Sequence, residues 1–407
     1  MRLALLIISS FLLVACISTS PSVMSPDPFL LSPQFNSSNA LASEDRWWLE
    51  FSDPKLNQLI QQGLNNNYSL KASFARLAQS QAQWDKAGSA KKPSAQLSTQ
   101  KSRQWQDGLN QVSSISDNWQ LGLTASYELD FWGRIDDLDE QALQQFNSTK
   151  AATYIQTNTV VSQVTLAWYG WVKEAKQLAL LHSQQQRIDE GLKVIRGRYL
   201  RGKVQSSDVW QQEQLLEAIH SDIINSQTAE EVYRQQLALW LGQSQAMDAT
   251  ELSLAQYDLP KIDSAIEQVS SMALQQRPDV QQAYAQLLAA HAGLKIAQSN
   301  RYPRFTLTAS YSGSAENPSD ILDSWLANII AGIALPLIDG GNLRAEVRRT
   351  EAVVDENLAN YQQTLLMAIQ EVEQALLNER QQFSLHRSLQ SQLDFAKKTQ
   401  RYQSQRY

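Results

Sequence analysis

An internal repeat is the feature of this chain that most restricts its fold. The segment from Asp53 to Thr99 recurs in altered form from Asp263 to Ala309, at a period of about 210 residues. Each copy reads as a helix, a proline, a strand, a loop, a second strand, a glycine turn and a very long helix. The period is too long for one unit of a solenoid, so the sequence predicts two copies of one half-fold. Superimposed landmarks include Leu64 with Leu274, Leu70 with Val280, Ala75 with Ala285, Pro93 with Pro303, Gly133 with Gly341 and Tyr199 with Tyr407.

The N-terminus has the pattern of a targeting signal. A single cation, Arg2, precedes a short apolar run from Leu3 to Val14, which is too short to span a bilayer. The run Leu13-Val14-Ala15-Cys16 resembles the lipobox of bacterial lipoproteins, in which the cysteine becomes the lipidated first residue. The alternative is an ordinary signal peptide with an incidental cysteine. Ile17 follows in place of the Asp that retains such lipoproteins at the inner membrane, so the resemblance implies the outer membrane.

Composition excludes several classes of protein. The net charge of -6 gives no basic surface for nucleic acid. Cys16 is the only cysteine, so no disulfide can form within the chain. No run of 18 or more apolar residues follows the N-terminal signal, which predicts no transmembrane helix in the mature chain.

Four segments alternate apolar and polar residues with the period of a half-buried strand. They are about 119–128, 304–312 and 325–335, with a weaker one at 95–103. Each is about ten residues long, as a tilted membrane-spanning strand requires, and aromatic residues cluster near the ends. A sheet with one solvated face is the alternative. Membrane strands must close into a barrel, and four are too few, so spanning strands require that several chains share one barrel. Two chains would supply eight strands and three would supply twelve.

The helical segments are too long for a globular domain. A helix over 134–199 would be about 100 Å long. Apolar positions recur in threes and fours, at a spacing near 3.5 residues, through this segment, the next helix and the second repeat. An ordinary helical bundle is the alternative. Helices of this length need partners along their whole extent, so joined to spanning strands they predict a helical tunnel that continues a barrel.

These features are similar to those of the TolC-type outer-membrane efflux proteins, in the lipoprotein branch that serves RND pumps (the NodT or OprM-like group). The similarity extends over nearly all of the mature chain. The residues that carry it are Trp47-Trp48, Phe51-Ser52-Asp53-Pro54, Tyr127 to Arg134, Arg277-Pro278-Asp279-Val280, Tyr302-Pro303, Leu335 to Gly341, and the spacing of Tyr199, Gly202, Ser206, Asp208 and Val209.

The resemblance implies a mixed α/β membrane protein that forms a homotrimer. A long antiparallel α-helical coiled-coil tunnel would continue into a transmembrane β-barrel with four strands from each chain. Residues 1–15 would be the signal peptide and 16–52 the lipidated tether. Repeat 1 (53–260) would hold strands near 94–128, a helix near 134–199, a tip turn and a return helix near 207–242. Repeat 2 (261–407) would hold strands near 303–336 and a helix near 342–407.

The resemblance also assigns roles to single residues. Cys16 would be lipidated. Turns at Gly133 and at Gly340-Gly341 would join barrel to tunnel, and glycine suits them because such turns often need positive φ. Tyr199, Gly202, Ser206 and Asp208 would contact a periplasmic adaptor at the tip. Asp208 would also pair with Tyr407 of the other repeat, or serve as the N-cap of the following helix.

Members of this family usually continue beyond the position of Tyr407, through a second tip turn and a closing helix. That turn carries gate carboxylates, so the resemblance assigns no gate residue in this chain. The expectation is that a 407-residue product assembles poorly or leaks, because the seam on 343–407 would lack its partner.

No catalytic constellation stands out in the sequence. The histidines His182, His220, His291 and His386 lie apart in helical stretches, and there is no HExxH pattern, Walker loop or dinucleotide fingerprint. The prediction is therefore a passive outer-membrane duct without cofactor or metal, not an enzyme. It would export small molecules with an adaptor and an inner-membrane RND-type pump. The alternatives are a duct for type I protein secretion and a lipid-anchored periplasmic coiled-coil scaffold without a pore.

Overall fold

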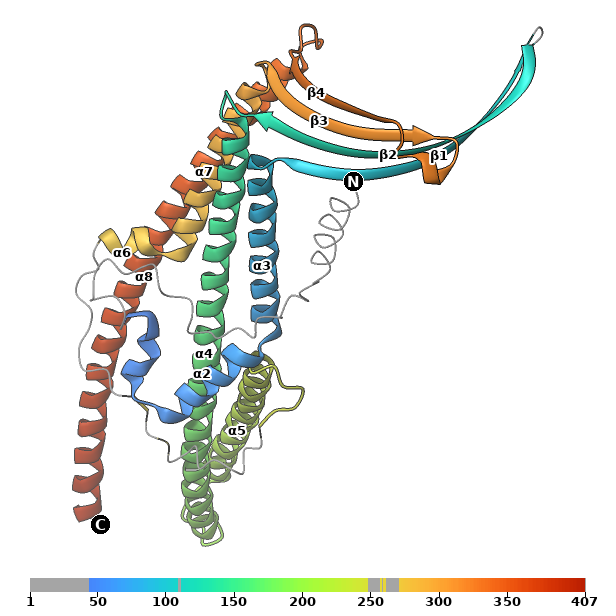
Figure 1. Ribbon diagram of the computed structural model, residues 1–407. Helices are drawn as coiled ribbons and strands as arrows, with labels where there is room; N and C mark the ends of the chain where they lie inside the picture. The colour runs from blue at the N-terminus through green and yellow to red at the C-terminus, as the bar shows by residue number, and fades with distance from the viewer. Residues whose placement is uncertain (1–43, 109–110, 248–256, 258, 261–270, 407) are drawn as a thin grey trace. The chain divides into compact units, whose positions relative to one another are not determined.

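The computed structural model describes residues 44–108, 111–247, 257, 259–260 and 271–406 (Figure 1). Cys16 and Tyr407 therefore lie outside the described residues. The elements are η1 Glu44–Phe51, α2 Pro54–Asn66, α3 Tyr68–Gly88, η2 Ser89–Lys91, β1 Ser94–Gly108, β2 Gln111–Leu129, α4 Arg134–Tyr199, α5 Ser206–Trp240, α6 Ser271–Gln276, α7 Pro278–Ser299, β3 Arg304–Ala315, η5 Pro318–Asp320, β4 Trp325–Ala334 and α8 Asn342–Arg406.

The chain folds into two compact units that cut across the sequence repeat. Unit 1 contains residues up to 71 and 159–260, and unit 2 contains 72–158 and 261–407. One boundary follows residue 260, where the sequence predicts that the first repeat ends. The other two fall inside α3 and inside α4, so each of these helices contributes to both units.

Unit 2 contains one antiparallel sheet in the order β1-β2-β3-β4. The weakest predicted strand, 95–103, is part of the 15-residue β1. Strand β2 is longer still, with 19 residues, whereas β3 has 12 and β4 has 10. The β1–β2 hairpin consequently extends beyond the end of β3, whose last residue, Ala315, pairs with Trp119 (Figure 1).

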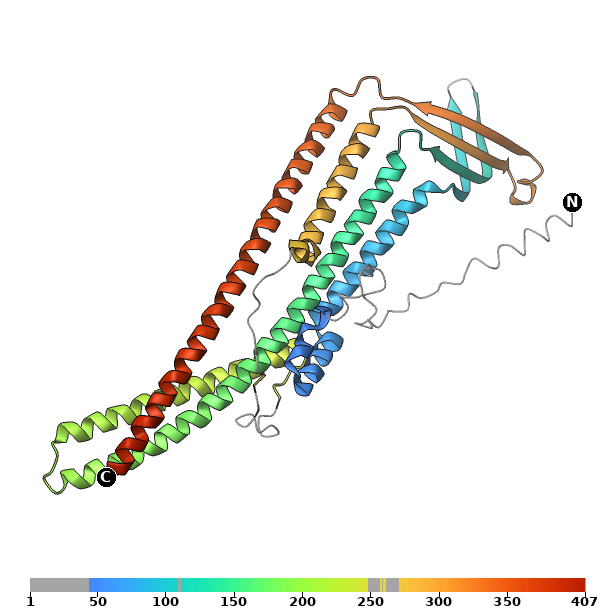
Figure 2. The same cartoon turned by 90° about the vertical axis from the view of Figure 1, so that its left-hand side faces the viewer.

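Four helices of unit 2 run side by side below this sheet, in the order α3, α4, α7, α8 (Figure 2). Trp84 of α3 stacks on Phe146 of α4 with ring centroids 5.7 Å apart. Lys295 of α7 pairs with Asp137 of α4 at 3.8 Å. The face of α7 that packs inward consists mainly of alanine, which lets neighbouring backbones approach closely. Among the described helices, none combines the length and apolarity needed to cross a membrane.

Unit 1 is built from α2, the second part of α4, and α5. Its core includes fully buried residues of all three helices, among them Leu59, Val164, Trp168, Trp171 and Leu237. Helices α4 and α5 are also joined by polar contacts. Ser226 Oγ donates to the buried Glu174 at 2.9 Å, and Trp171 Nε1 donates to Glu230 at 3.1 Å. Because buried polar groups must be paired, these contacts fix the register of the two helices.

Asp53 is the polar centre of unit 1 and is only 5% exposed. Its Oδ1 accepts hydrogen bonds from the backbone of Lys55 at 2.9 Å and of Leu56 at 3.0 Å, which caps α2. Its Oδ2 accepts from Trp168 Nε1 at 3.0 Å and from Tyr169 OH at 3.2 Å. The Tyr257 hydroxyl also donates to this carboxylate. Asp53 thereby ties the N-terminal segment, α4 and the chain after α5 together.

The ionisation of Asp53 follows from these contacts. Burial alone would raise its pKa, but the hydrogen bonds from Tyr257, Leu56, Trp168 and Tyr169 together lower the pKa below its ordinary value. The carboxylate is therefore charged in the folded protein. Its contribution to stability is complete above the unfolded-state pKa of about 3.9 and is lost as pH falls through the lower folded-state pKa.

We expect Asp53→Asn to lower the free energy of unfolding by about 2–4 kcal/mol, because the amide offers fewer acceptors to donors that are buried. The variant should also lose less stability than the wild type when the pH is lowered below about 4. Denaturant unfolding in detergent, followed by tryptophan fluorescence, measures both quantities. Asp189→Asn is the control, since Asp189 makes only a surface pair with Lys193 at 2.6 Å. Equal losses for the two variants would contradict the role given to Asp53.

Candidate channel wall, helix turns and tip

The two faces of the sheet differ in chemistry. One face carries apolar rows across the strands, such as Leu97, Leu123, Tyr311 and Ala327. The opposite face carries hydroxyl and amide rows, such as Gln96, Thr124, Ser310 and Asn328. Neither face is covered by a helix of unit 2, and on β4 the side chain of Ile329 is 81% exposed. Four polar residues of β2, namely Gln120, Thr124, Ser126 and Glu128, all lie on the polar face.

Aromatic side chains gather at both ends of the apolar face. At the helix end, Phe131 packs edge-on against Phe305, and Trp132 stacks on Tyr302, both with centroids 4.9 Å apart. At the far end Tyr311 stacks on Trp325 at 5.3 Å. The apolar file of β2 from Leu129 to Trp119 covers ten residue steps, or about 33 Å along the strand at roughly 3.3 Å per residue. Tilted by about 40°, such a strand spans a band of about 25 Å.

The turn from β2 into α4 is fixed by two carboxylates that precede Gly133 in the chain. Glu128 forms a two-pronged ion pair with Arg134, at 3.0 and 2.7 Å. Asp130 Oδ2 accepts from the backbone N–H groups of Ile135 and Asp136, both at 2.9 Å. Gly133 has φ +74°, a conformation that an L-residue adopts only with strain. Reversal of the chain here therefore depends on Gly133 and on capping by Asp130.

A second set of contacts joins this turn to the start of β3. Trp132 Nε1 donates to the carbonyl of Pro303 at 2.8 Å, and Ser299 Oγ donates to the carbonyl of Trp132 at 3.3 Å. The first repeat's strand-to-helix turn and the second repeat's helix-to-strand turn thus share one hydrogen-bonded junction. The rings of Trp132 and Tyr302, both part of the family-like motifs in the sequence, form its apolar side.

The turn from β4 into α8 also combines glycine with a capping aspartate, at a different spacing from that in the β2–α4 turn. Gly340 and Gly341 have φ of +65° and +89°. Asp339 accepts from the backbone of Gly341 at 2.9 Å and of Leu343 at 2.7 Å. These backbone hydrogen bonds hold the pKa of Asp339 below its ordinary value. The sequence pattern predicts the glycines of both turns but not the capping roles of Asp130 and Asp339. An aspartate one to three residues before the glycine is the signal that identifies them.

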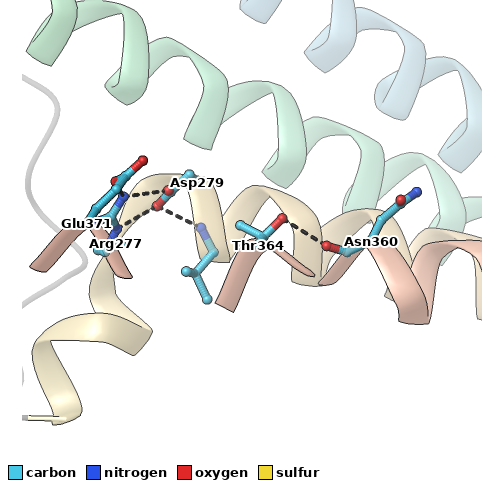
Figure 3. Close-up of polar contacts among 6 residues, drawn as sticks. Arg277, Asp279, Asn360, Thr364 and Glu371 are labelled. Atoms are coloured by element: carbon cyan, nitrogen blue, oxygen red, sulfur yellow. Dashed lines mark hydrogen bonds and ion pairs between the residues drawn. The ribbon is translucent and has the colours of Figure 1, made fainter. Parts of the chain in front are cut away.

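The motif Arg277-Pro278-Asp279 connects α7 to α8 (Figure 3). Pro278 is the first residue of α7, as the sequence allows. The guanidinium of Arg277 donates to both oxygens of Asp279, at 3.1 and 2.8 Å, and to Glu371 of α8 at 2.5 Å. Arg277 lowers the pKa of Asp279 below its ordinary value, so that carboxylate stays charged. The motif therefore holds the first turn of α7 against a fixed point on α8.

The turn between α4 and α5 has a regular geometry. Gly202, with φ +67°, donates to the carbonyl of Tyr199 at 2.8 Å, and Lys203 donates to that of Arg198 at 3.0 Å. These two bonds form a Schellman motif at the end of α4. Helix α5 begins at Ser206.

Asp208 caps α5 in a different way from the one expected. The N-cap is Gln205, and Asp208 is the third helical residue of a capping box, with its Oδ2 accepting from the backbone of Gln205 at 2.9 Å. The interpretation of Asp208 as the N-cap is therefore wrong by three positions. The expected Asp208–Tyr407 pair involves a residue outside the described part of the chain.

Large apolar side chains are exposed around this turn, among them Leu200 at 84% and Trp210 at 66%. Just above it, Arg196 of α4 pairs with Glu213 of α5 at 2.6 Å. A hollow beside the turn is lined by Ile195, Arg198, Val204, Asp208 and Leu215, among others. The four residues expected to form the tip thus lie at the last residue of α4, in the turn that follows it and in the first residues of α5. In the described residues, no group of three or more His, Cys, Asp or Glu side chains is arranged to hold a metal ion.

A long four-stranded sheet with one apolar face, joined by tight turns to helices of 66 and 65 residues, defines a channel protein of the TolC-like outer-membrane type. A family model described as outer membrane efflux protein matches residues 59–243 and 269–407. The chain belongs to this family. It is accordingly a protein of the outer membrane of a Gram-negative bacterium.

Relatives and solved structures agree with this assignment. The pyoverdine export outer membrane protein OpmQ of Pseudomonas putida is 29% identical over 378 residues, covering 90% of this chain and 80% of the relative. The cation efflux system protein CusC of Escherichia coli K12 is 26% identical over 336 residues, covering 81% and 72%. The structure of the outer-membrane channel OprN superimposes with a TM-score of 0.73 at 27% identity, covering 82% of this chain and 76% of that one. A structure of CusC gives 0.72 at 25% identity, covering 87% and 82%.

We expect Gly341→Ala to destabilise the protein by about 1–2 kcal/mol, because φ +89° forces a Cβ into the strained left-handed region. Gly197→Ala is the matched control. No atom outside the local helix backbone lies within 4 Å of a Cβ built at Gly197, and the residue lies within α4, where alanine is favoured over glycine by about 1 kcal/mol. Thermal unfolding in detergent should therefore move in opposite directions for the two variants. A rise in melting temperature for both would show that the turn does not depend on glycine.

Proposed function

We propose that this protein is the passive outer-membrane duct of a tripartite efflux system. Three chains would form a homotrimer in which four strands from each close a twelve-stranded barrel, and the long helices would form a periplasmic tunnel below it. The two-faced sheet is the observation that carries the proposal. Its apolar face has the length of a membrane band and aromatic residues at both ends, whereas its polar face offers hydrogen-bonding groups to water.

The edges of the sheet support a shared barrel. In the described residues β1 and β4 each pair with one neighbour only, so each has one free row of backbone N–H and C=O groups. Unpaired backbone groups are not tolerated in hydrocarbon. Pairing β4 of one protomer with β1 of the next would satisfy both edges.

The tip would be the contact site for a periplasmic adaptor protein, with Tyr199, Gly202, Ser206 and Asp208 in the contact. The exposed apolar residues beside them, Leu200 and Trp210, suit a helical partner. Lipidation of Cys16 would anchor the chain to the membrane. The pairing of Asp208 with Tyr407 across the repeats remains a prediction, which a double-mutant cycle on channel closure would test.

Energy for transport would come from an inner-membrane pump of the RND type, and the duct itself would be neither an enzyme nor dependent on a cofactor. Relatives of similar identity are named for pyoverdine export, cation efflux and toluene efflux, which are chemically different cargoes. We therefore propose small molecules as the substrate class and place their selection in the pump. A duct for type I protein secretion remains the alternative.

Two adjacent residues on opposite faces of β2 provide the test. Thr124 lies on the polar face, paired with Ser310, and Leu123 lies on the apolar face, paired with Tyr311. In a planar bilayer, we expect Thr124→Cys channels to lose current when a charged, membrane-impermeant thiol reagent is added. Leu123→Cys channels should be unaffected, because that side chain faces lipid.

The detergent-corrected molar mass of the same preparation should correspond to three chains. Absence of any conductance, with the protein present in the membrane, would favour a scaffold without a pore. Equal modification of the two cysteine variants would show that the assignment of the faces is wrong.

A further inference from the structure

The outer part of the β1–β2 hairpin carries charged side chains to which the proposed duct assigns no role. Beyond Ala315 and Trp325, where β3 and β4 meet their outer loop, β1 and β2 continue as a two-stranded ribbon. On the face that continues the apolar file, the residues change abruptly from apolar to charged. Lys101 pairs with Trp119, and Arg103 with Asp117.

One cation lies level with Trp119, and the other lies one row further out on the same face. Lys101 Nζ lies over the Trp119 ring, 5.1 Å from its centroid. Arg103 forms a two-pronged ion pair with Asp117, at 2.8 and 2.9 Å, and its side chain remains 52% exposed. Lys101, Arg103 and Asp117 together carry one net positive charge. Two residue pairs further out, Trp105 is 69% exposed opposite Ile115.

The position of these residues relative to a membrane follows from the proposed function, on which this inference rests. Trp119 ends the apolar file, so it would lie at the interface between hydrocarbon and headgroups. Lys101 is at the same level and Arg103 is about 7 Å further along the strand. This is the depth of the headgroup phosphates. A lysine whose ammonium group lies over an interfacial tryptophan carries its charge at the membrane interface, and its flexible alkyl chain allows that charge to reach the headgroup layer.

We propose that Lys101, with Arg103 beside it, binds the phosphate of a lipid headgroup in the outer leaflet. The lipid-facing side of β1 would thereby hold the outer end of the hairpin at a fixed depth, and the exposed Trp105 would lie among the headgroups. Charge complementarity selects a phosphate-bearing headgroup over a neutral one. Asp117 limits the site to one net positive charge by pairing with Arg103.

Carboxylates at the same end of the sheet set a condition on the experiment. Glu316, Asp320 and Asp323 belong to the β3–β4 loop, and Asp320 accepts from Ser319 at 2.7 Å and from Asn317 at 3.4 Å. A divalent cation would bridge these carboxylates to a lipid phosphate without Lys101. Binding must therefore be measured in the presence of EDTA.

The test uses the oligomer in detergent and two probes, diphosphoryl lipid A and the same lipid without phosphates, counted by native mass spectrometry. We expect about tenfold tighter binding of the phosphorylated lipid to the wild type. The double variant Gln100→Lys with Lys101→Gln keeps the net charge but moves the cation to the polar face, and it should lose most of this preference. Lys101→Arg should keep it, and Asp117→Asn should increase it by freeing Arg103.

Three results would overturn the inference: a wild-type preference that survives the exchange of Gln100 and Lys101, displacement of the lipid by millimolar inorganic phosphate, or no preference in the wild type. Conductance of the wild-type preparation separates this failure from that of the proposed function. Channels that conduct without preferring phosphorylated lipid contradict only the lipid site. A preparation that forms no channels contradicts the proposed duct, and it contradicts the lipid site as well because that site rests on the duct.

Discussion

Backbone hydrogen bonding at the edges of one sheet is the constraint on which the rest of the structure depends. The described sheet has two free edges and no helical layer on either face, so it cannot be stable alone in water or in lipid. In the proposed assembly, closure with copies of itself would satisfy the edges, and the membrane would cover the apolar face. The long helices would then hold the sheets of the proposed trimer in register, because each strand pair is joined to them by turns only a few residues long.

The turns from β2 into α4 and from β4 into α8 connect a strand directly to a long helix. A glycine with positive φ allows the reversal, a carboxylate from Asp130 or Asp339 satisfies the first helical N–H groups, and aromatic contacts at Trp132 hold the first junction against β3. The two repeats use the same components at different spacings. Both turns therefore combine a glycine of positive φ with an aspartate that caps the helix, although the individual hydrogen bonds differ between the copies.

Much of this organisation could be predicted from local pattern. The range expected for the first long helix, 134–199, is that of α4, and the alternation around 119–128 and 325–335 indicates β2 and β4. The weakly patterned 95–103 forms part of a long strand, because pairing with β2 outweighs its low apolar content. The hydrogen-bonded cluster around Asp53 could not be predicted from the sequence. Its donors Trp168, Tyr169 and Tyr257 are more than a hundred residues away in sequence and meet the carboxylate only in the folded chain.

The sequence by itself determined the repeat, the extent of the long helices and the two chemistries of the sheet, because each depends on residue spacing within one element. The tertiary structure decided which carboxylates cap, clamp or stay buried, and how the repeats are divided between the two compact units. It also placed Lys101 beside Trp119 and Arg103 opposite Asp117, since strand register is set by pairing between distant segments and not by either strand alone.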